Sequence, residues 1–251
     1  MITEPAFYAV AVPAVILTGL AKGGFLGALG GFSVPLISLV ISPIEAAGIM
    51  LPILIAMDMV GLAAYRGEYD RKNLVILLPA ALAGIAIGWA TAAYVTEAHV
   101  RLIVGLVGFV FAARYWLQRA PHAPLPGPDR LKGMFWGTVA GFTSFVSHTG
   151  APPFQVYMLP QRLPNALYAG TGVIFFATVN MVKVIPYAAL GQFSAANLST
   201  VAVLMPLAPI AMLAGVWLTR RVPQGPFYAV LHAGLLIVSA KLIYDALGTL
   251  L

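Results

Sequence analysis

Long apolar runs separated by short polar breaks set the limits on what this chain can fold into. A helix needs about 20 apolar residues to cross the hydrocarbon core of a bilayer. Only 9% of the 251 residues are charged, whereas soluble domains carry roughly 25%. The pattern therefore predicts an all-α integral membrane protein. The expected spans are 6–21, 45–65, 74–95, 99–117, 133–147, 165–189, 197–219 and 226–248.

The rest of the composition excludes several classes of protein. There are no cysteines, so disulfides, thiolate metal sites and thiol redox chemistry are ruled out. The 14 basic residues lie mostly in short loops between apolar runs, where they act as topology signals, so nucleic acid is not an expected partner. The opening residues MITEPAFYAV contain no basic region. We therefore expect the first apolar segment to be retained and not cleaved.

The two halves of the chain share an ordered set of landmarks. Gly19, Gly23 and Pro35 recur 118 positions later as Gly137, Gly141 and Pro153. Asp58 and Tyr65 match Asn180 and Tyr187 at an offset of 122, and the loop 67–74 matches 191–198 at an offset of 124. This order favours an internal repeat over chance likeness between apolar segments. We expect a first transmembrane repeat at 1–118, a Pro-rich charged linker at 119–132 and a second repeat at 133–251.

Basic residues indicate that the two repeats point in opposite directions, because Lys and Arg stay on the cytoplasmic side. The loop 66–73 has three basic residues and its counterpart 191–197 has none, while Arg101 stands alone in 96–101 against Arg220 and Arg221 in 220–225. Such a reversal requires an odd number of spans in each half. We favour two inverted repeats of about five membrane segments each over four plus four. Five plus five places 10 of the 14 basic residues in the cytoplasm: Arg66, Arg71, Lys72, Arg114, Arg119, Arg130, Lys132, Arg162, Arg220 and Arg221.

Two further apolar stretches, 24–41 and 150–161, are short and interrupted by Gly and Pro. Such segments at equivalent places in two halves are typical of broken or re-entrant helices that line a substrate site near the midplane. For Gly19, Gly23 and Gly27 close helix packing is the favoured interpretation. For Gly30, Gly31, Ser33 and Pro35 we favour an unwound turn, whose N–H groups would attract an anion.

These segments carry a family resemblance. The Gly-rich segment that closes on Val34-Pro35 resembles the TauE/SafE sulfite exporter family, as does the loop 65–74 followed by a span with Gly84 and Gly88. The resemblance covers essentially the whole chain and implies export of sulfur-containing anions such as sulfite or organosulfonates. The chain departs from the family pattern in two places: its glycines are divided between Gly23-Gly24 and Gly30-Gly31, and the second copy has His148-Thr149-Gly150.

Polar side chains inside the expected spans are the remaining candidates for the site, because such groups are costly in a membrane and usually face a cavity. Lys22 lies beside the first break, although it could instead extend to the interface. Hydroxyls near His148 suit an oxyanion. Asp58 is a coupling group or the partner of Lys22 or Lys183. The expected substrate-binding residues are Lys22, Gly30, Gly31, Ser33, Ser144, Ser147, His148, Thr149, Gln155 and Asn180, with Asp58 and Lys183 as a coupling site or ion pair.

A secondary carrier that works by alternating access explains the repeat, the broken segments and the buried polar groups together. An anion channel, or a carrier of an unrelated solute, is the alternative. An enzyme is not expected, because the four histidines are scattered and form no metal or nucleophile set. We expect a multi-pass protein of the inner cell membrane with no cofactor and no metal. Its expected partners are a small anion and the bilayer, and homo-oligomerisation stays open.

Overall fold

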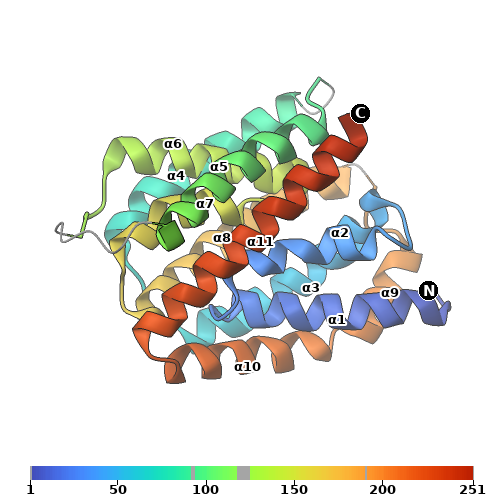
Figure 1. Ribbon diagram of the computed structural model, residues 1–251. Coiled ribbons are helices and arrows are strands. Elements are labelled where there is room, and N and C mark those ends of the chain that lie inside the picture. Colours follow the sequence, from blue (N-terminus) through green and yellow to red (C-terminus); the bar gives the residue numbers. More distant parts are fainter. Residues whose placement is uncertain (1, 92–93, 118–124, 190, 251) are drawn as a thin grey trace. The chain divides into compact units, whose positions relative to one another are not determined.

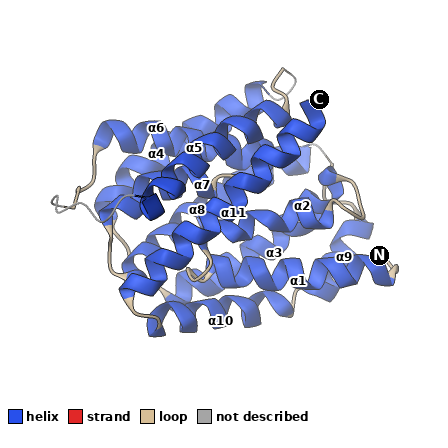
Figure 2. Ribbon diagram, viewed as in Figure 1, coloured by secondary structure: helices blue, strands red, loops and turns tan. Residues whose placement is uncertain are grey.

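The computed structural model describes residues 2–91, 94–117, 125–189 and 191–250, and every regular element within them is helical (Figure 2). Residues 118–124, which include much of the predicted linker, lie outside the described residues. The elements (Figure 1) are α1 (Pro5–Lys22), the 3₁₀ helix η1 (Gly27–Phe32), α2 (Ser33–Ile37), α3 (Pro43–Ala64), α4 (Arg71–Thr91), α5 (Glu97–Leu117), α6 (Arg130–Ser147), α7 (Ala151–Met158), the 3₁₀ helix η2 (Leu159–Gln161), α8 (Asn165–Ala189), α9 (Ala195–Leu204), α10 (Leu207–Arg221) and α11 (Gln224–Leu250).

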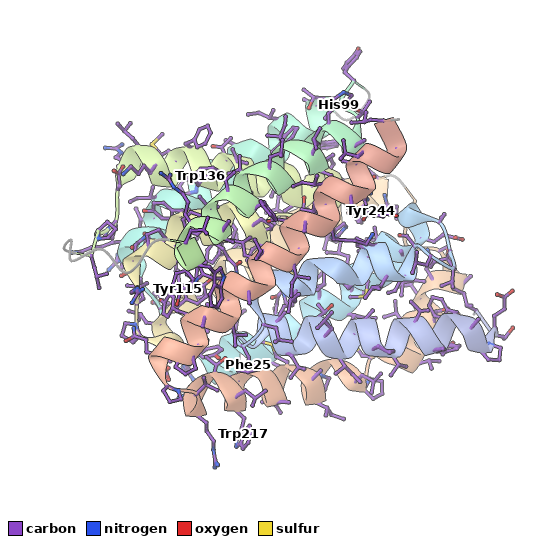
Figure 3. The ribbon with its side chains drawn as sticks, viewed as in Figure 1. Phe25, His99, Tyr115, Trp136, Trp217 and Tyr244 are labelled. Atoms are coloured by element: carbon purple, nitrogen blue, oxygen red, sulfur yellow. The ribbon has the colours of Figure 1, made fainter. Side chains whose placement is uncertain are left out.

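Six of these helices are long and apolar enough to cross a membrane, namely α1, α3, α4, α5, α8 and α11. The pair α9 and α10 makes a seventh if it is taken as one bent span. Several large apolar side chains in the helices are more than half exposed, for example Ile103, Ile210 and Ile237. Trp217 likewise projects away from α10 (Figure 3). Apolar surface on this scale requires lipid as the solvent, so the chain is a multi-pass membrane protein.

Helix starts are set by short polar side chains. Ser42 and Glu45 form a capping box at the start of α3, and the Ser194 hydroxyl accepts from the backbone N–H of Asn197 at the start of α9. At the start of α6, the Asp129 carboxylate accepts from the N–H of Lys132 at 3.0 Å. That hydrogen bond holds the pKa of Asp129 below its ordinary value. Each cap satisfies an N–H group that has no partner within its helix.

The expected span 197–219 is in fact two helices, α9 and α10, with a bend of 47° between them. The break falls at Met205 and Pro206, because proline lacks an N–H donor and its ring clashes with the preceding turn. Proline alone does not explain the bend, since α1, α3, α4 and α8 keep Pro13, Pro52, Pro79 and Pro186 inside continuous helices.

The chain forms two compact units, and each unit combines segments from both halves of the sequence. Unit 1 contains Met1–Leu26, Gly30–Tyr69 and Asn165–Val222, and unit 2 contains Gly27–Leu29, Asp70–Pro164 and Pro223–Leu251. The predicted repeats at 1–118 and 133–251 are defined by equivalent positions in the sequence. The compact units do not test that division, which stays a prediction.

A close helix pair organises unit 1. α1 packs along α10 (Figure 1). A Cβ atom added at Gly19 would lie 2.3 Å from the Cβ atom of Ala211, and one added at Gly23 would lie 2.6 Å from the backbone of Gly215. Real Cβ atoms do not approach other atoms so closely, so the two glycines are required for this contact. The packing interpretation therefore holds for Gly19 and Gly23.

Unit 2 is organised by a comparable pair, in which α6 packs against α4. A Cβ atom at Gly141 would lie 2.1 Å from the carbonyl oxygen of Ala81, and one at Gly84 would lie 2.1 Å from that of Thr138. The same unit packs α5 against α11, where Tyr115 stacks on His232 at 3.8 Å between ring centroids. Small residues again set the helix spacing.

Candidate functional site

The break after α1 is a glycine-dependent helix end. Gly24 has a φ of +102°, which an ordinary L-residue rarely adopts. The N–H of Gly24 donates to the carbonyl of Ala21, and the N–H of Phe25 donates to that of Leu20. These two bonds define a Schellman end. The helix therefore stops at Lys22, and this side chain is placed at the negative end of the α1 dipole, which favours a cation.

The carbonyl oxygen of Gly23 is held by two hydroxyl groups from other helices. Tyr65, which follows α3, donates to it at 2.5 Å, and Thr219 of α10 donates at 2.9 Å. We call these three residues the carbonyl clasp. Because a carbonyl beyond the end of a helix lacks its intrahelical donor, the clasp both satisfies it and fixes the end of α1 against α3 and α10.

Next to the clasp lies a buried group of polar residues, which we call the charged cluster: Lys22, Asp58, Asn180 and Lys183. The Lys22 ammonium nitrogen is 2.6 Å from Asp58 Oδ1. Asn180 Nδ2 donates to the other carboxylate oxygen, Oδ2, at 2.8 Å. Asp58 and Tyr65 are seven residues apart and so share one face of α3. That face engages Lys22, the last residue of α1, by charge, and Gly23, the next residue in the chain, by a hydrogen bond.

The charged cluster contains more positive than negative groups. Lys183 lies one turn after Asn180 on α8, is buried, and interacts electrostatically with both Asp58 and Lys22. Asp58 is the one acidic side chain that is buried among the residues that the structure describes. The Lys22 ammonium also lies 6.0 Å from the ring centroid of Phe176. The charged cluster thus contains two lysines and a single buried carboxylate.

A second charged group lies beyond the clasp, at the ends of α3 and α10. Arg220 donates to the carboxylate of Glu68 at 2.7 Å and to the carbonyl of Ala64 at 2.9 Å. Its guanidinium lies 5.5 Å from the ring centroid of Tyr65. Both partners of this ion pair are partly exposed, so it contributes little to stability by itself. Arg220 therefore links α10 to the end of α3 beside the clasp tyrosine.

An unwound turn was expected at Gly30, Gly31, Ser33 and Pro35. Instead, Gly30 and Gly31 lie in the 3₁₀ helix η1, and Ser33 and Pro35 lie in α2. A Cβ atom at Gly30 would lie 2.9 Å from that of Ala21, so this part of the turn packs back on α1. The Ser33 hydroxyl donates to the carbonyl of Gly30 at 3.0 Å. Gly31 lies in the same turn. The segment is broken and short, as the sequence indicated.

The break in the second half joins α6 to α7 through His148, which has a φ of +54°. Hydroxyls bridge this break: Ser147 and Thr149 are hydrogen-bonded at 2.6 Å, and Thr143 donates to the carbonyl of Thr149 at 3.1 Å. Ser144 and Gln155 are buried in the same unit. The amide nitrogen of Gln155 lies against Gly27, where an added Cβ atom would be 2.2 Å away.

The predicted site residues therefore fall into two groups. Lys22, Asp58, Asn180 and Lys183 form the charged cluster, and Gly30, Gly31 and Ser33 belong to the same unit. Ser144, Ser147, His148, Thr149 and Gln155 belong to unit 2. Sequence reasoning did not assign the clasp residues Tyr65 and Thr219 to the site. The seven-residue spacing from Asp58 was a usable signal for Tyr65, while nothing in the sequence pointed to Thr219.

One cavity lies apart from these residues. It has a volume of about 470 Å³ and is lined in unit 2 by Asp129, Lys132, Trp136, Tyr157, Gln161 and neighbouring residues. None of the predicted substrate-binding residues lines it. Gln161 is already engaged, since it exchanges two hydrogen bonds with Asn73. The charged cluster, and not this cavity, is therefore the candidate site.

The helices and the buried charges together define a polytopic membrane protein with an internal polar site. A model of the sulfite exporter TauE/SafE family matches residues 11–242, or 232 of the 251 residues. The chain belongs to this family, whose members are membrane transporters and not enzymes. No curated protein and no solved structure matches the chain.

Proposed function

We propose that this protein is a secondary transporter that exports small sulfur-containing anions, such as sulfite or organosulfonates, by alternating access, and that the charged cluster binds the anion. The observation that carries the proposal is the presence of two lysines and one buried carboxylate in the charged cluster: Lys22 pairs with Asp58 at 2.6 Å, and Lys183 is buried one turn after Asn180, which donates to the same carboxylate. Family membership supports a sulfite-type anion as the substrate.

The charges of the cluster favour an anion as its ligand. A charge in the interior of a membrane protein is costly unless it is paired. With both lysines protonated, the cluster has one positive charge more than Asp58 can neutralise. A bound anion supplies the missing negative charge, and Asn180 supplies a neutral hydrogen-bond donor beside it. A cation substrate would increase the excess charge, so the cluster disfavours it.

Three observations support an internal repeat as the basis of the transport cycle, and the loop charges favour an inverted one. Gly67 and Gly191, which are 124 positions apart, both have positive φ, at 83° and 68°. Asn73 and Asn197, at the same offset, each donate a backbone N–H to a capping side chain three residues earlier. The α1–α10 pair of unit 1 also has its counterpart in the α6–α4 pair of unit 2. Oppositely oriented repeats would supply equivalent inward- and outward-facing states in the inner membrane.

We propose a role in substrate binding for a second group of residues as well. Ser144, Ser147, His148, Thr149 and Gln155 surround the break between α6 and α7, and Gly30, Gly31 and Ser33 follow the break after α1. We assign these residues to substrate binding through hydroxyl, amide and backbone donors.

The test is anion uptake into proteoliposomes, preceded by a thermal-shift screen against sulfite, thiosulfate, taurine, sulfoacetate, phosphate and chloride. Lys183→Met and Lys22→Met should each lower sulfite or sulfonate flux about tenfold or more, because removing one partner from a buried charged site costs roughly 2–5 kcal/mol. Lys241→Met is the matched control, since Lys241 pairs with Asp245 at an exposed position, and its flux should stay unchanged.

Two results would overturn the proposal. Unchanged flux in both cluster variants would remove the charged cluster from the transport pathway. Flux that follows the anion gradient and never accumulates anion against it, with a rate far above that of a carrier, would identify an anion channel instead.

A further inference from the structure

We propose that the cavity at the start of α6 binds the headgroup of a zwitterionic phospholipid with a primary ammonium group, of the phosphatidylethanolamine type. All of its lining residues belong to unit 2, and none of them belongs to the charged cluster. Its volume of about 470 Å³ is within the range of roughly 300–1,000 Å³ that is usual for small-ligand sites. This second site goes beyond the proposed function and does not depend on it.

The charged residues that line the cavity match a headgroup with one positive and one negative end. They are Asp129 and Lys132, and the Lys132 ammonium nitrogen lies 3.7 Å from Asp129 Oδ2. The two side chains are 43% and 73% exposed, so both can reach a ligand. Lys132 suits a phosphate group, and Asp129 suits an ammonium group. A purely anionic headgroup would instead be repelled by the Asp129 carboxylate.

The other lining groups favour the ammonium end. Pro126, Gly127 and Pro128 line the cavity, and because proline has no N–H group, this segment offers more hydrogen-bond acceptors than donors. Trp136 and Tyr157 supply aromatic rings, whose faces attract a cation. A primary ammonium donates up to three N–H bonds. It therefore suits these acceptors better than a choline group, which has no N–H to donate.

An apolar surface beside the cavity favours a lipid over a free solute. Trp136 lies on α6 (Figure 3), and its ring packs nearly perpendicular to that of Phe135, with 4.9 Å between centroids. Phe135 is more than half exposed, and so is Leu131 one turn earlier. With the headgroup in the cavity, acyl chains would lie along these two side chains. Tryptophan and lysine near one end of a membrane helix are also typical of the headgroup level.

The experiment measures lipid binding to the purified, delipidated protein in detergent by native mass spectrometry. The probes are phosphatidylethanolamine, phosphatidylcholine and phosphatidylglycerol with the same acyl chains. The wild type should bind phosphatidylethanolamine about threefold more tightly than either of the others, because a partly exposed charge or cation–π contact changes a Kd by a few-fold. Equal binding of the three lipids would overturn the inference, and this result needs no variant.

Two variants separate the roles of the charged residues. Asp129→Asn keeps a residue that caps a helix and removes only the charge, so the preference for phosphatidylethanolamine over phosphatidylglycerol should disappear. Lys132→Gln should weaken all three lipids about threefold and keep their order, because each has a phosphate. Asp245→Asn is the matched control, since its carboxylate pairs with Lys241 on α11 and does not line the cavity. An unchanged preference in Asp129→Asn would contradict the assignment of the ammonium.

Free O-phosphoethanolamine tests whether the ligand is a lipid. It should displace phosphatidylethanolamine only at concentrations at least about tenfold above that of the lipid, because it lacks the acyl chains that would cover Leu131 and Phe135. Displacement at equal concentration would overturn the assignment to a lipid and would identify a soluble amine phosphate as the ligand.

Discussion

The carbonyl clasp makes a quantitative prediction, because one acceptor is shared by two donors from different elements. Tyr65→Phe removes the hydroxyl that reaches the Gly23 carbonyl at 2.5 Å, and Thr219→Val removes the one at 2.9 Å. Each substitution leaves the other donor in place. Side-chain hydrogen bonds between membrane helices are worth about 0.6 kcal/mol on average, so each single variant should lose about that much stability.

The double variant is different, because it leaves a buried carbonyl with no donor. An unsatisfied buried acceptor costs about 1–3 kcal/mol. The sum of the single losses is about 1.2 kcal/mol, so the double loss should exceed that sum by roughly 1 kcal/mol or more. The clasp residues are buried, so water cannot easily replace the missing donors.

The measurement is a double-mutant cycle on reversible unfolding in mixed detergent micelles, followed by circular dichroism. Thr178→Val serves as the matched control, since its hydroxyl donates to the carbonyl of Ile174 within the same helix. Combined with Tyr65→Phe, it should be additive. Additivity of Tyr65→Phe and Thr219→Val within about 0.3–0.5 kcal/mol would refute the shared-acceptor argument.

Two further predictions concern packing and pH. Gly141→Ala should destabilise the protein by about 1–3 kcal/mol, because its new Cβ atom would lie 2.1 Å from the Ala81 carbonyl, while Gly225→Ala, which meets open space, should be neutral in the same unfolding assay. Asp129 has a lowered pKa because it accepts from the Lys132 N–H. Its contribution should be complete above pH about 4 and be lost as the pH falls through the lowered value, and Asp129→Ala should abolish this part of the pH dependence in a thermal melt.

Most helices could be predicted from hydropathy alone, and their observed bounds show why. The expected span 165–189 coincides with α8, and all the others except 197–219, which is two helices, agree with single helices to within about four residues, because span length is set by membrane thickness. The bend before Pro206 could not be predicted in the same way. Pro186 lies in a continuous helix and Pro206 does not, and the difference depends on neighbours that satisfy the freed backbone groups.

The candidate site was only partly predictable. The sequence indicated that Lys22 and Asp58 are costly in a membrane, but it left Asp58 with either Lys22 or Lys183 as its partner, and the ion pair with Lys22 is seen only in the structure. Thr219 is an ordinary hydroxyl in an apolar run. Its contact with Gly23 joins residues 196 positions apart, and no local pattern carries that information.

The proposed repeat also explains why the charges of the site are unequal between the halves. At the offsets given above, Lys22 corresponds to Ala140 and Lys183 corresponds to Gly61. A Cβ atom at Gly61 would lie 2.4 Å from the Met212 methyl carbon and 2.9 Å from a Val173 methyl carbon, so a second lysine there would require these side chains to move.

Asp58 and Asn180 occupy equivalent positions of the proposed repeat, and here too the two halves differ in charge. Their side chains are 2.8 Å apart. Two ionised carboxylates at that distance would repel each other, whereas an amide opposite a carboxylate donates a hydrogen bond. The shared glycines would build two equivalent scaffolds, and the unshared polar residues would make a single anion site in one of them. Substituting Asn180→Asp should therefore weaken anion binding more than Asn180→Ala does, because it adds a negative charge where the substrate must bind. Equal losses in the two variants would show that Asn180 acts only as a hydrogen-bond donor.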